Sequence, residues 1–208
     1  MIYDYSDDGS WLPIIAAVFV IEALFIPLTK SISENGRTWY GHFGIVSILA
    51  DVGIILLGFA ASRYVFAAYG LGSSYTPWQR ASIFSATLLW MQIVHDVIYY
   101  FVFITGLLAS SSNGIVSFMK KYGSEGKLWP IAGDSAMMVS AGLLAHALST
   151  MPNHAIIIVL IAAIYVIPYM ISPKYSAGSS EHHRKTVPVE QPRVPQYRRS
   201  SGVIVCNI

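Results

Sequence analysis

The sequence has little charge: Asp, Glu, Lys and Arg make up 12% of its 208 residues, against about 25% in an ordinary soluble domain. It has one cysteine, Cys206, which excludes an intrachain disulfide and a thiolate metal cluster within one chain. No Lys or Arg precedes the first apolar run, so the basic start of a cleavable secretory signal is missing and we expect that run to be retained. Hydrophobic residues make up 54% and the mean hydropathy is +0.54, which indicates a membrane protein.

Five apolar runs are long enough to cross a membrane, since a hydrocarbon layer of roughly 30 Å takes about 20 helical residues. Short alternating strands of the barrel type are absent from the sequence, and continuous apolar runs favour helices. The sequence therefore predicts an all-α fold: a polytopic integral membrane protein with a bundle of five transmembrane helices. The expected spans are residues 11–28, 44–66, 81–107, 129–148 and 154–171.

The C-terminal residues 172–208 differ from the rest in composition. Four prolines, together with Ser, Gly and basic residues, leave too little apolar surface for this segment to fold alone, so we expect a disordered arm. Such an arm suits anionic lipid, nucleic acid or an acidic protein surface, and we expect a capsid or scaffold protein as one partner. Its basic residues are Lys174, Arg184, Lys185, Arg193, Arg198 and Arg199.

The distribution of basic residues predicts the orientation of the chain. With the N-terminus outside, eleven of the thirteen Lys and Arg fall in inner segments, and only Arg63 and Arg80 fall on the other side. The positive-inside rule then places the acidic residues 1–10 outside and the C-terminus on the cytoplasmic side.

Polar residues interrupt the third apolar run, within MQIVHDVIYYF. At about 100° per residue, Gln92, His95, Asp96, Tyr99 and Tyr100 fall in one arc about 140° wide. A carboxylate in hydrocarbon costs at least a few kcal/mol, so this arc is expected to face other helices or a water-filled space. Because adjacent helical positions do not face each other, we expect His95 and Asp96 to reach other groups, with Gln92 and Tyr100 available to Asp96.

Three further acids share a depth in the expected spans. Glu22, Asp51 and Asp134 are expected about 8 to 10 Å below the inner surface, and Asp96 about 17 Å below it, with no Lys or Arg at matching depth. Such acids serve either as hydrogen-bonding contacts between helices or as a path for protons or cations. We expect the first, in a structural or scaffolding protein; the alternative is a small proton- or cation-coupled transporter or channel.

Enzymatic and cofactor chemistries have weaker support. The stretch IAGDS around Asp134 is similar to the GxGD motif of intramembrane aspartyl proteases, but Ile131 holds the first glycine position and no YD motif lies within a span. His95 and His146 differ in depth by about 8 Å, which disfavours haem ligation by the two. No Lys lies in the middle of a span, which excludes a retinal Schiff base. We expect no catalytic residue, no cofactor and no metal site.

Three stretches together resemble one family: WMQIVHDVIYYF, the basic FMKKYG loop, and WPIAGDSAMMVSAGLL. The chain is similar over about residues 90–144 to uncharacterised multi-pass membrane proteins encoded by nucleocytoplasmic large DNA viruses. The resemblance rests on the HD pair, the basic loop and the GDS-M-M pattern, and does not extend to Glu22 or Asp51. It implies a viral membrane component without enzymatic activity, in the internal membrane of the particle. Apart from the resemblance, we expect the lipid bilayer and a second copy of the chain as partners.

Overall fold

The computed structural model describes residues 2–71, 75–126 and 129–172. The expected basic arm, apart from Ser172, lies outside these residues, and so do its six basic side chains. In chain order the helices are η1 (Asp8–Ser10), α1 (Trp11–Ile32), α2 (Glu34–His42), α3 (Ile45–Ala68), α4 (Pro77–Ile98), the π-helix η2 (Tyr99–Leu107), α5 (Gly114–Gly126), α6 (Trp129–Leu148) and α7 (Asn153–Ile171).

Five helical segments are long and apolar enough to cross a membrane: Asp8–Ile32, Ile45–Ala68, Pro77–Leu107, Pro130–Leu148 and Asn153–Ile171. The predicted all-α fold with five spans is confirmed, and the chain is an integral membrane protein. Many large apolar side chains on the outer faces are exposed, for example Leu57 at 61% and Ile158 at 64%. Such faces suit contact with lipid, in which apolar exposure has no cost.

Local sequence sets the start and end of the long helices. Before α4, the Thr76 side chain accepts from the backbone N–H of Gln79, whose side chain accepts from the Thr76 N–H in return, and Pro77 occupies the first turn. This capping box satisfies two backbone donors that a helix start leaves unpaired. After the C-terminal end of α3, Gly70 has φ +60°, and its N–H donates to the Ala67 carbonyl oxygen. A glycine adopts this left-handed conformation without steric cost, so the helix ends there.

Two short helices lie where the sequence indicated only connecting segments. Before α2, the Ser33 hydroxyl accepts from the Gly36 N–H at 3.2 Å. Before α5, the Asn113 side-chain oxygen accepts from the Ile115 N–H at 2.9 Å. Ser and Asn are favoured N-caps for this reason, so the reading of FMKKYG as a loop was wrong: this stretch lies in α5.

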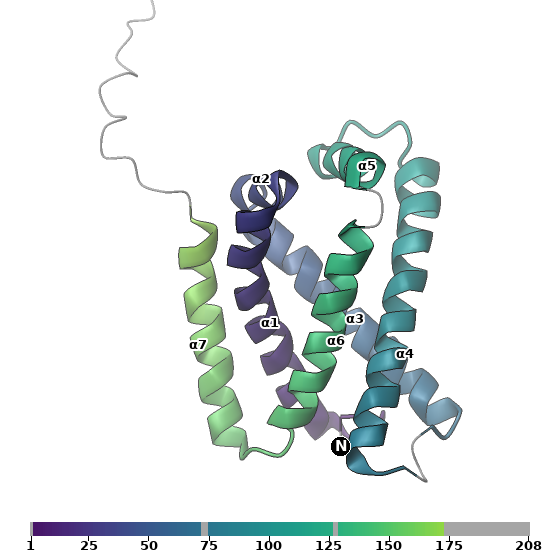
Figure 1. The fold of residues 1–208 in the computed structure, drawn as a ribbon, viewed down its shortest axis with the longest axis vertical. Helices are drawn as coiled ribbons and strands as arrows, with labels where there is room; N and C mark the ends of the chain where they lie inside the picture. Colours follow the sequence, from purple (N-terminus) through teal and green to yellow (C-terminus); the bar gives the residue numbers. More distant parts are fainter. Residues whose placement is uncertain (1, 72–74, 127–128, 173–208) are drawn as a thin grey trace, which may run out of the picture. The chain divides into compact units, whose positions relative to one another are not determined.

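Four of the spans surround a common interior: α1 packs against α3 and α6, and α4 packs against the same two helices. α7 packs on α1, outside this ring of four. Figure 1 shows α2 and α5 at one end of the bundle and the N-terminus at the opposite end. We call the end that carries α2 and α5 the α2/α5 end, and the end where the chain begins the N-terminal end.

Small residues let the helices of the ring approach closely. On α6, Ala141 and Ala145 are fully buried. A Cβ at Gly142 would lie 2.7 Å from Leu88 Cδ1, and one at Gly58 would lie 2.5 Å from Met138 Cε. Backbones at such small residues come close enough for van der Waals packing, which is the main attraction between helices in lipid.

Candidate functional site

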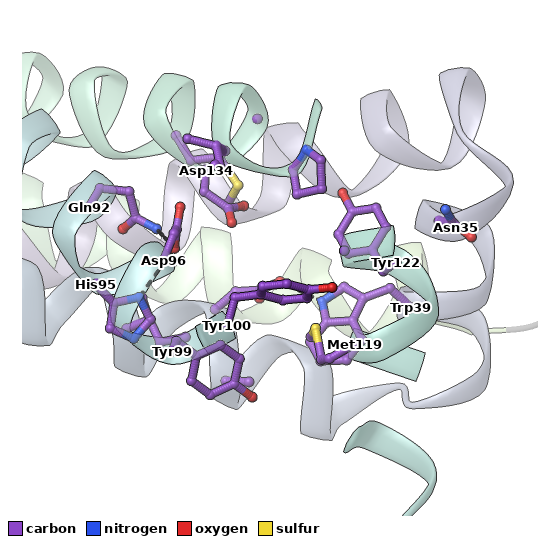
Figure 2. Close-up of a pocket in the computed structure, with 18 of the residues that line it drawn as sticks. Asn35, Trp39, Gln92, His95, Asp96, Tyr99, Tyr100, Met119, Tyr122 and Asp134 are labelled. Atoms are coloured by element: carbon purple, nitrogen blue, oxygen red, sulfur yellow. Dashed lines mark hydrogen bonds and ion pairs between the residues drawn. The ribbon is translucent and has the colours of Figure 1, made fainter. Parts of the chain in front are cut away.

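A cavity of about 510 Å³ lies within the ring of helices at the α2/α5 end. Side chains from α1, α2, α3, α4, η2, α5 and α6 line it, whereas none of the described lining residues comes from α7. Three aspartates from three different helices line this cavity: Asp51, Asp96 and Asp134 (Figure 2). The structure thus brings together acids that lie up to 83 positions apart in the sequence.

Asp51 is held by two donors from α2. Its Oδ2 accepts from Trp39 Nε1 at 2.9 Å and from the Tyr40 hydroxyl at 3.0 Å. Burial, together with the negative charge of Asp51, raises the pKa of Tyr40 far above its ordinary range, so the phenol keeps its proton and remains a donor. Asp51 therefore joins α2 to α3. The sequence-based prediction did not include Trp39 or Tyr40 as donors because it assigned no helix to the segment that forms α2.

Asp96 is held within its own helix. Its Oδ1 accepts from Gln92 Nε2 at 2.7 Å, and His95 Nδ1 lies 3.2 Å from the same oxygen. The expectation that His95 and Asp96 do not meet was therefore wrong. Nδ1 is the ring nitrogen nearest the backbone, so it reaches a carboxylate on the next residue when both side chains lean toward one cavity. The other oxygen, Oδ2, is buried and has no hydrogen-bond partner among the described residues.

Asp134 differs from the other two aspartates because it forms no hydrogen bond with any other described residue. Asp134 is exposed because it faces the open cavity, and the walls of the cavity surround its carboxyl group. Asp96 and Asp51 are both close enough to act on it electrostatically. Figure 2 shows the Asp134 side chain directed into the space that Asp96 and Tyr100 also border.

Glu22 lies behind this cavity and not on its wall. It is fully buried, and neither carboxyl oxygen has a hydrogen-bond partner among the residues described. The Tyr40 hydroxyl lies beside it but donates to Asp51. Glu22 also lies ten residues before the end of α1 at Ile32, about 15 Å at 1.5 Å per residue. The expected depth of 8 to 10 Å was counted from residue 28, whereas α1 continues to Ile32; the depth itself stays a prediction.

The cavity wall next to Asp96 is a π-helix, η2, which begins at Tyr99. Tyr99, Tyr100, Phe101 and Ile104 of this helix all line the cavity. Val97 of α4 and Phe101 of η2 also line the cavity, although angles of about 100° per residue put both on the side opposite to Gln92. π-Helical segments occur frequently at functional sites, and this wall of the cavity therefore has a geometry that is common at such sites.

α5 covers the cavity with Phe118, Met119 and Tyr122. Gly123 of α5 lies against the Tyr100 ring so closely that a Cβ there would overlap it. Burial, with the negative charges of Asp134 and Asp51, raises the pKa of Tyr122 to about 12. Tyr122 is therefore a neutral phenol at physiological pH.

Lys and Arg are absent from the described residues of the cavity wall, and His95 is the one basic side chain among them. Lys30 of α1 donates its Nζ to the Met170 carbonyl oxygen at 2.8 Å. A buried carboxylate without a cation is costly, and the cost is removed by a proton or by a bound positive charge.

The N-terminal end is built differently. Arg63 of α3 is fully buried; its Nη2 donates to the carbonyl oxygens of Asp4 and Asp7, and its guanidinium lies 4.7 Å from the centre of the Trp11 ring. The Tyr3 hydroxyl lies 2.7 Å from His146 Nδ1. The residues before α1 thus close this end of the bundle, and His146 lies at the end opposite to His95.

Fold and site define an integral membrane protein with an acidic internal cavity. No family model, no curated protein and no solved structure matches the chain. The resemblance to viral membrane proteins therefore stays a prediction.

Proposed function

We propose that the protein is a small proton- or cation-coupled transporter or channel, in which the acidic cavity holds the transported charge. The observation that carries this proposal is Asp134, which faces the cavity without a hydrogen bond to any described residue while two further aspartates stand close to it. Ionisable groups inside a membrane commonly mark ion pathways. A proton or a cation supplies the missing positive charge.

The position of the cavity supports entry from the α2/α5 end. Asn35 and Gly36 of α2 and Ile115 of α5 belong to its wall, so it extends to the helices that cover this end. At the N-terminal end, by contrast, the segment before α1 is fastened through Tyr3 and Arg63. Release on that side requires these contacts to open, as a gate does.

Flux measurements in proteoliposomes test the proposal. With a pH-sensitive dye or sodium- and potassium-sensitive dyes inside, vesicles that hold the protein should pass protons or cations faster than protein-free vesicles. Asp134→Asn should lower this flux by at least about tenfold, because it removes the unpaired charge. Asp8→Asn is the matched control, since Asp8 is exposed and lies outside the cavity. Flux equal to that of empty vesicles, or unchanged by Asp134→Asn, contradicts the proposal.

The second candidate is a structural or scaffolding protein, in the viral membrane that the resemblance implies. The hydrogen bonds from Trp39 and Tyr40 to Asp51 favour it, because they tie α2 to α3 as a purely structural acid would. In this case Asp to Asn exchanges in the cavity should leave assembly unchanged. The basic arm would then supply contacts to a capsid or scaffold protein, to anionic lipid or to nucleic acid.

Both candidates are non-enzymatic. An aspartyl protease needs two carboxyl groups that share a proton. In the part of the chain that the structure describes, no hydrogen bond joins two carboxyl groups; Asp51 and Asp96 accept instead from Trp, Tyr, Gln and His side chains.

A further inference from the structure

We infer that the cavity takes an organic ammonium cation, an amine or quaternary ammonium group on a small apolar body, with Asp134 as its counter-ion and aromatic rings around it. This inference rests on the proposed cation-binding role of the cavity and names the class of its ligand. Three features of the wall support it: its size, the state of its carboxyl groups and its aromatic content.

The size of the cavity suits a small molecule. Its volume of about 510 Å³ falls in the range of about 300 to 1,000 Å³ typical of small-molecule sites. A bare metal ion needs instead a tight set of ligands at about 2.0 to 2.6 Å from its centre. In the ranges that the structure describes, no group of three His, Cys, Asp or Glu side chains is placed to hold one.

The carboxyl groups of the wall are not equivalent. Asp51 has two donors on one oxygen, and Asp96 has Gln92 and His95 on one oxygen. Asp134 has no such partner, although it faces the open space. Among the described residues of the wall, Asp134 is thus the carboxyl group with neither oxygen held, and Asp96 Oδ2 is a second acceptor without a partner beside it, which suits a ligand that brings a positive centre to Asp134.

Aromatic rings occupy much of the remaining wall. They come from α2, from η2 and from α5: Trp39, Tyr40, Tyr99, Tyr100, Phe118 and Tyr122. Figure 2 shows Tyr100, Tyr122 and Trp39 around the space that Asp134 faces. The face of an aromatic ring attracts an ammonium group, most of all when both are shielded from water, and quaternary ammonium ligands are recognised in this way. A hydrated sodium or calcium ion gains less from such a wall, since it favours oxygen ligands.

Calorimetric titration of the purified full-length chain in lipid nanodiscs tests the inference. The probe is choline chloride; its neutral isostere 3,3-dimethyl-1-butanol, sodium chloride and calcium chloride serve as comparisons at matched ionic strength. Choline should bind, and the neutral alcohol and both metal ions should bind at least about tenfold more weakly. Binding of the alcohol as tightly as choline, or preferential binding of either metal ion, overturns the inference.

Variants locate the site. Asp134→Asn should weaken choline binding at least about tenfold, and Asp134→Glu, which keeps the charge, should restore most of it. Tyr122→Leu should weaken binding about threefold or more, whereas Tyr122→Phe, which keeps the ring, should not. Asp8→Asn and Trp90→Leu are matched controls on residues outside the cavity, and circular dichroism checks that each variant is folded. Choline binding that is unchanged in both Asp134→Asn and Tyr122→Leu overturns the inference.

The outcomes separate this inference from the proposed function. Proton or metal-ion flux that depends on Asp134, without choline binding, refutes the ligand class and leaves the transport role intact. Choline binding that depends on Asp134, without flux of protons or any cation tested, refutes transport and leaves the ligand class intact.

Discussion

The two ends of the bundle bury charge in opposite ways. At the N-terminal end, Arg63 is fully buried, donates to two carbonyl oxygens and stacks on Trp11. At the α2/α5 end, Asp134 faces a cavity and none of the described residues on the wall is Lys or Arg. The chain supplies acceptors for Nη2 of Arg63, and Trp11 lies beside its guanidinium, although Nε and Nη1 have no hydrogen-bond partner among the described residues. No described residue donates a hydrogen bond to Asp134, which leaves room for a proton or a ligand.

The largest effect on this contrast is expected from Arg63→Met. This change removes the guanidinium donor from the carbonyl oxygens of Asp4 and Asp7 and should lower the free energy of unfolding by about 3 kcal/mol, because hydrogen bonds from charged donors contribute about 1.5 to 3 kcal/mol. Unfolding in detergent micelles by SDS, followed by circular dichroism, measures it. Arg37→Met is the control, since Arg37 is exposed on α2. An equal decrease in the free energy of unfolding for both variants would show that the buried guanidinium does not stabilise the N-terminal end.

A smaller effect is expected from Asp96. Asp96→Leu leaves the Gln92 and His95 donors unpaired, whereas Asp96→Asn keeps an accepting oxygen. We expect Leu to be less stable than Asn by about 1 kcal/mol, since hydrogen bonds within membranes contribute about that or less. The same unfolding assay compares the two. Equal stability would mean that Asp96 is solvated in the cavity and does not support the fold.

A similar or slightly smaller effect, about 1 kcal/mol, is expected where α5 meets η2. A Cβ at Gly123 would overlap the Tyr100 ring, so Gly123→Ala should push α5 away from the cavity. Besides the loss of stability, cavity residues should become more accessible: a Cys placed at Met119 should react faster with a water-soluble maleimide. This test needs a background in which Cys206 is replaced by Ser. Gly41→Ala is the control, because nothing lies within 4 Å of a Cβ there. Unchanged labelling in Gly123→Ala would show that α5 does not depend on this contact.

The smallest effect is expected for Tyr3 at the N-terminal end, where we expect stability to depend on pH. Burial raises the pKa of Tyr3 to about 12, from about 10 in an unfolded chain. Below about pH 10 the phenol is neutral in both states; between about pH 10 and 12 the unfolded state loses its proton first, so the free energy of unfolding falls as pH rises. Tyr3→Phe should show less of this fall between about pH 10 and 12, measured as the difference between the two proteins. An identical fall in both would show that Tyr3 is not protected by the fold.

The α2/α5 end also shows how far sequence reasoning reaches. Helical angles placed Gln92, His95, Asp96, Tyr99 and Tyr100 in one arc, and all five line the cavity. The same angles put Val97 and Phe101 on the opposite side, yet both line the cavity as well, so the wall is wider than the predicted arc. The two donors of Asp51 were also missed, although the N-cap Ser33 marks the start of their helix. At the N-terminal end nothing in the sequence linked Arg63 to Asp4 or Asp7, since backbone carbonyl acceptors leave no residue pattern.

The sequence by itself determined the class of protein and the positions of its five spans, because the length and hydrophobicity of a segment are local properties that decide whether it crosses a membrane. It also determined that four acids lie within those spans. Only the tertiary structure decided that Asp51, Asp96 and Asp134 share one cavity while Glu22 lies behind it, and that Arg63 closes the opposite end. The rotation of one helix against another depends on the packing of small residues such as Gly58 and Gly142 against distant side chains, and no local pattern encodes it.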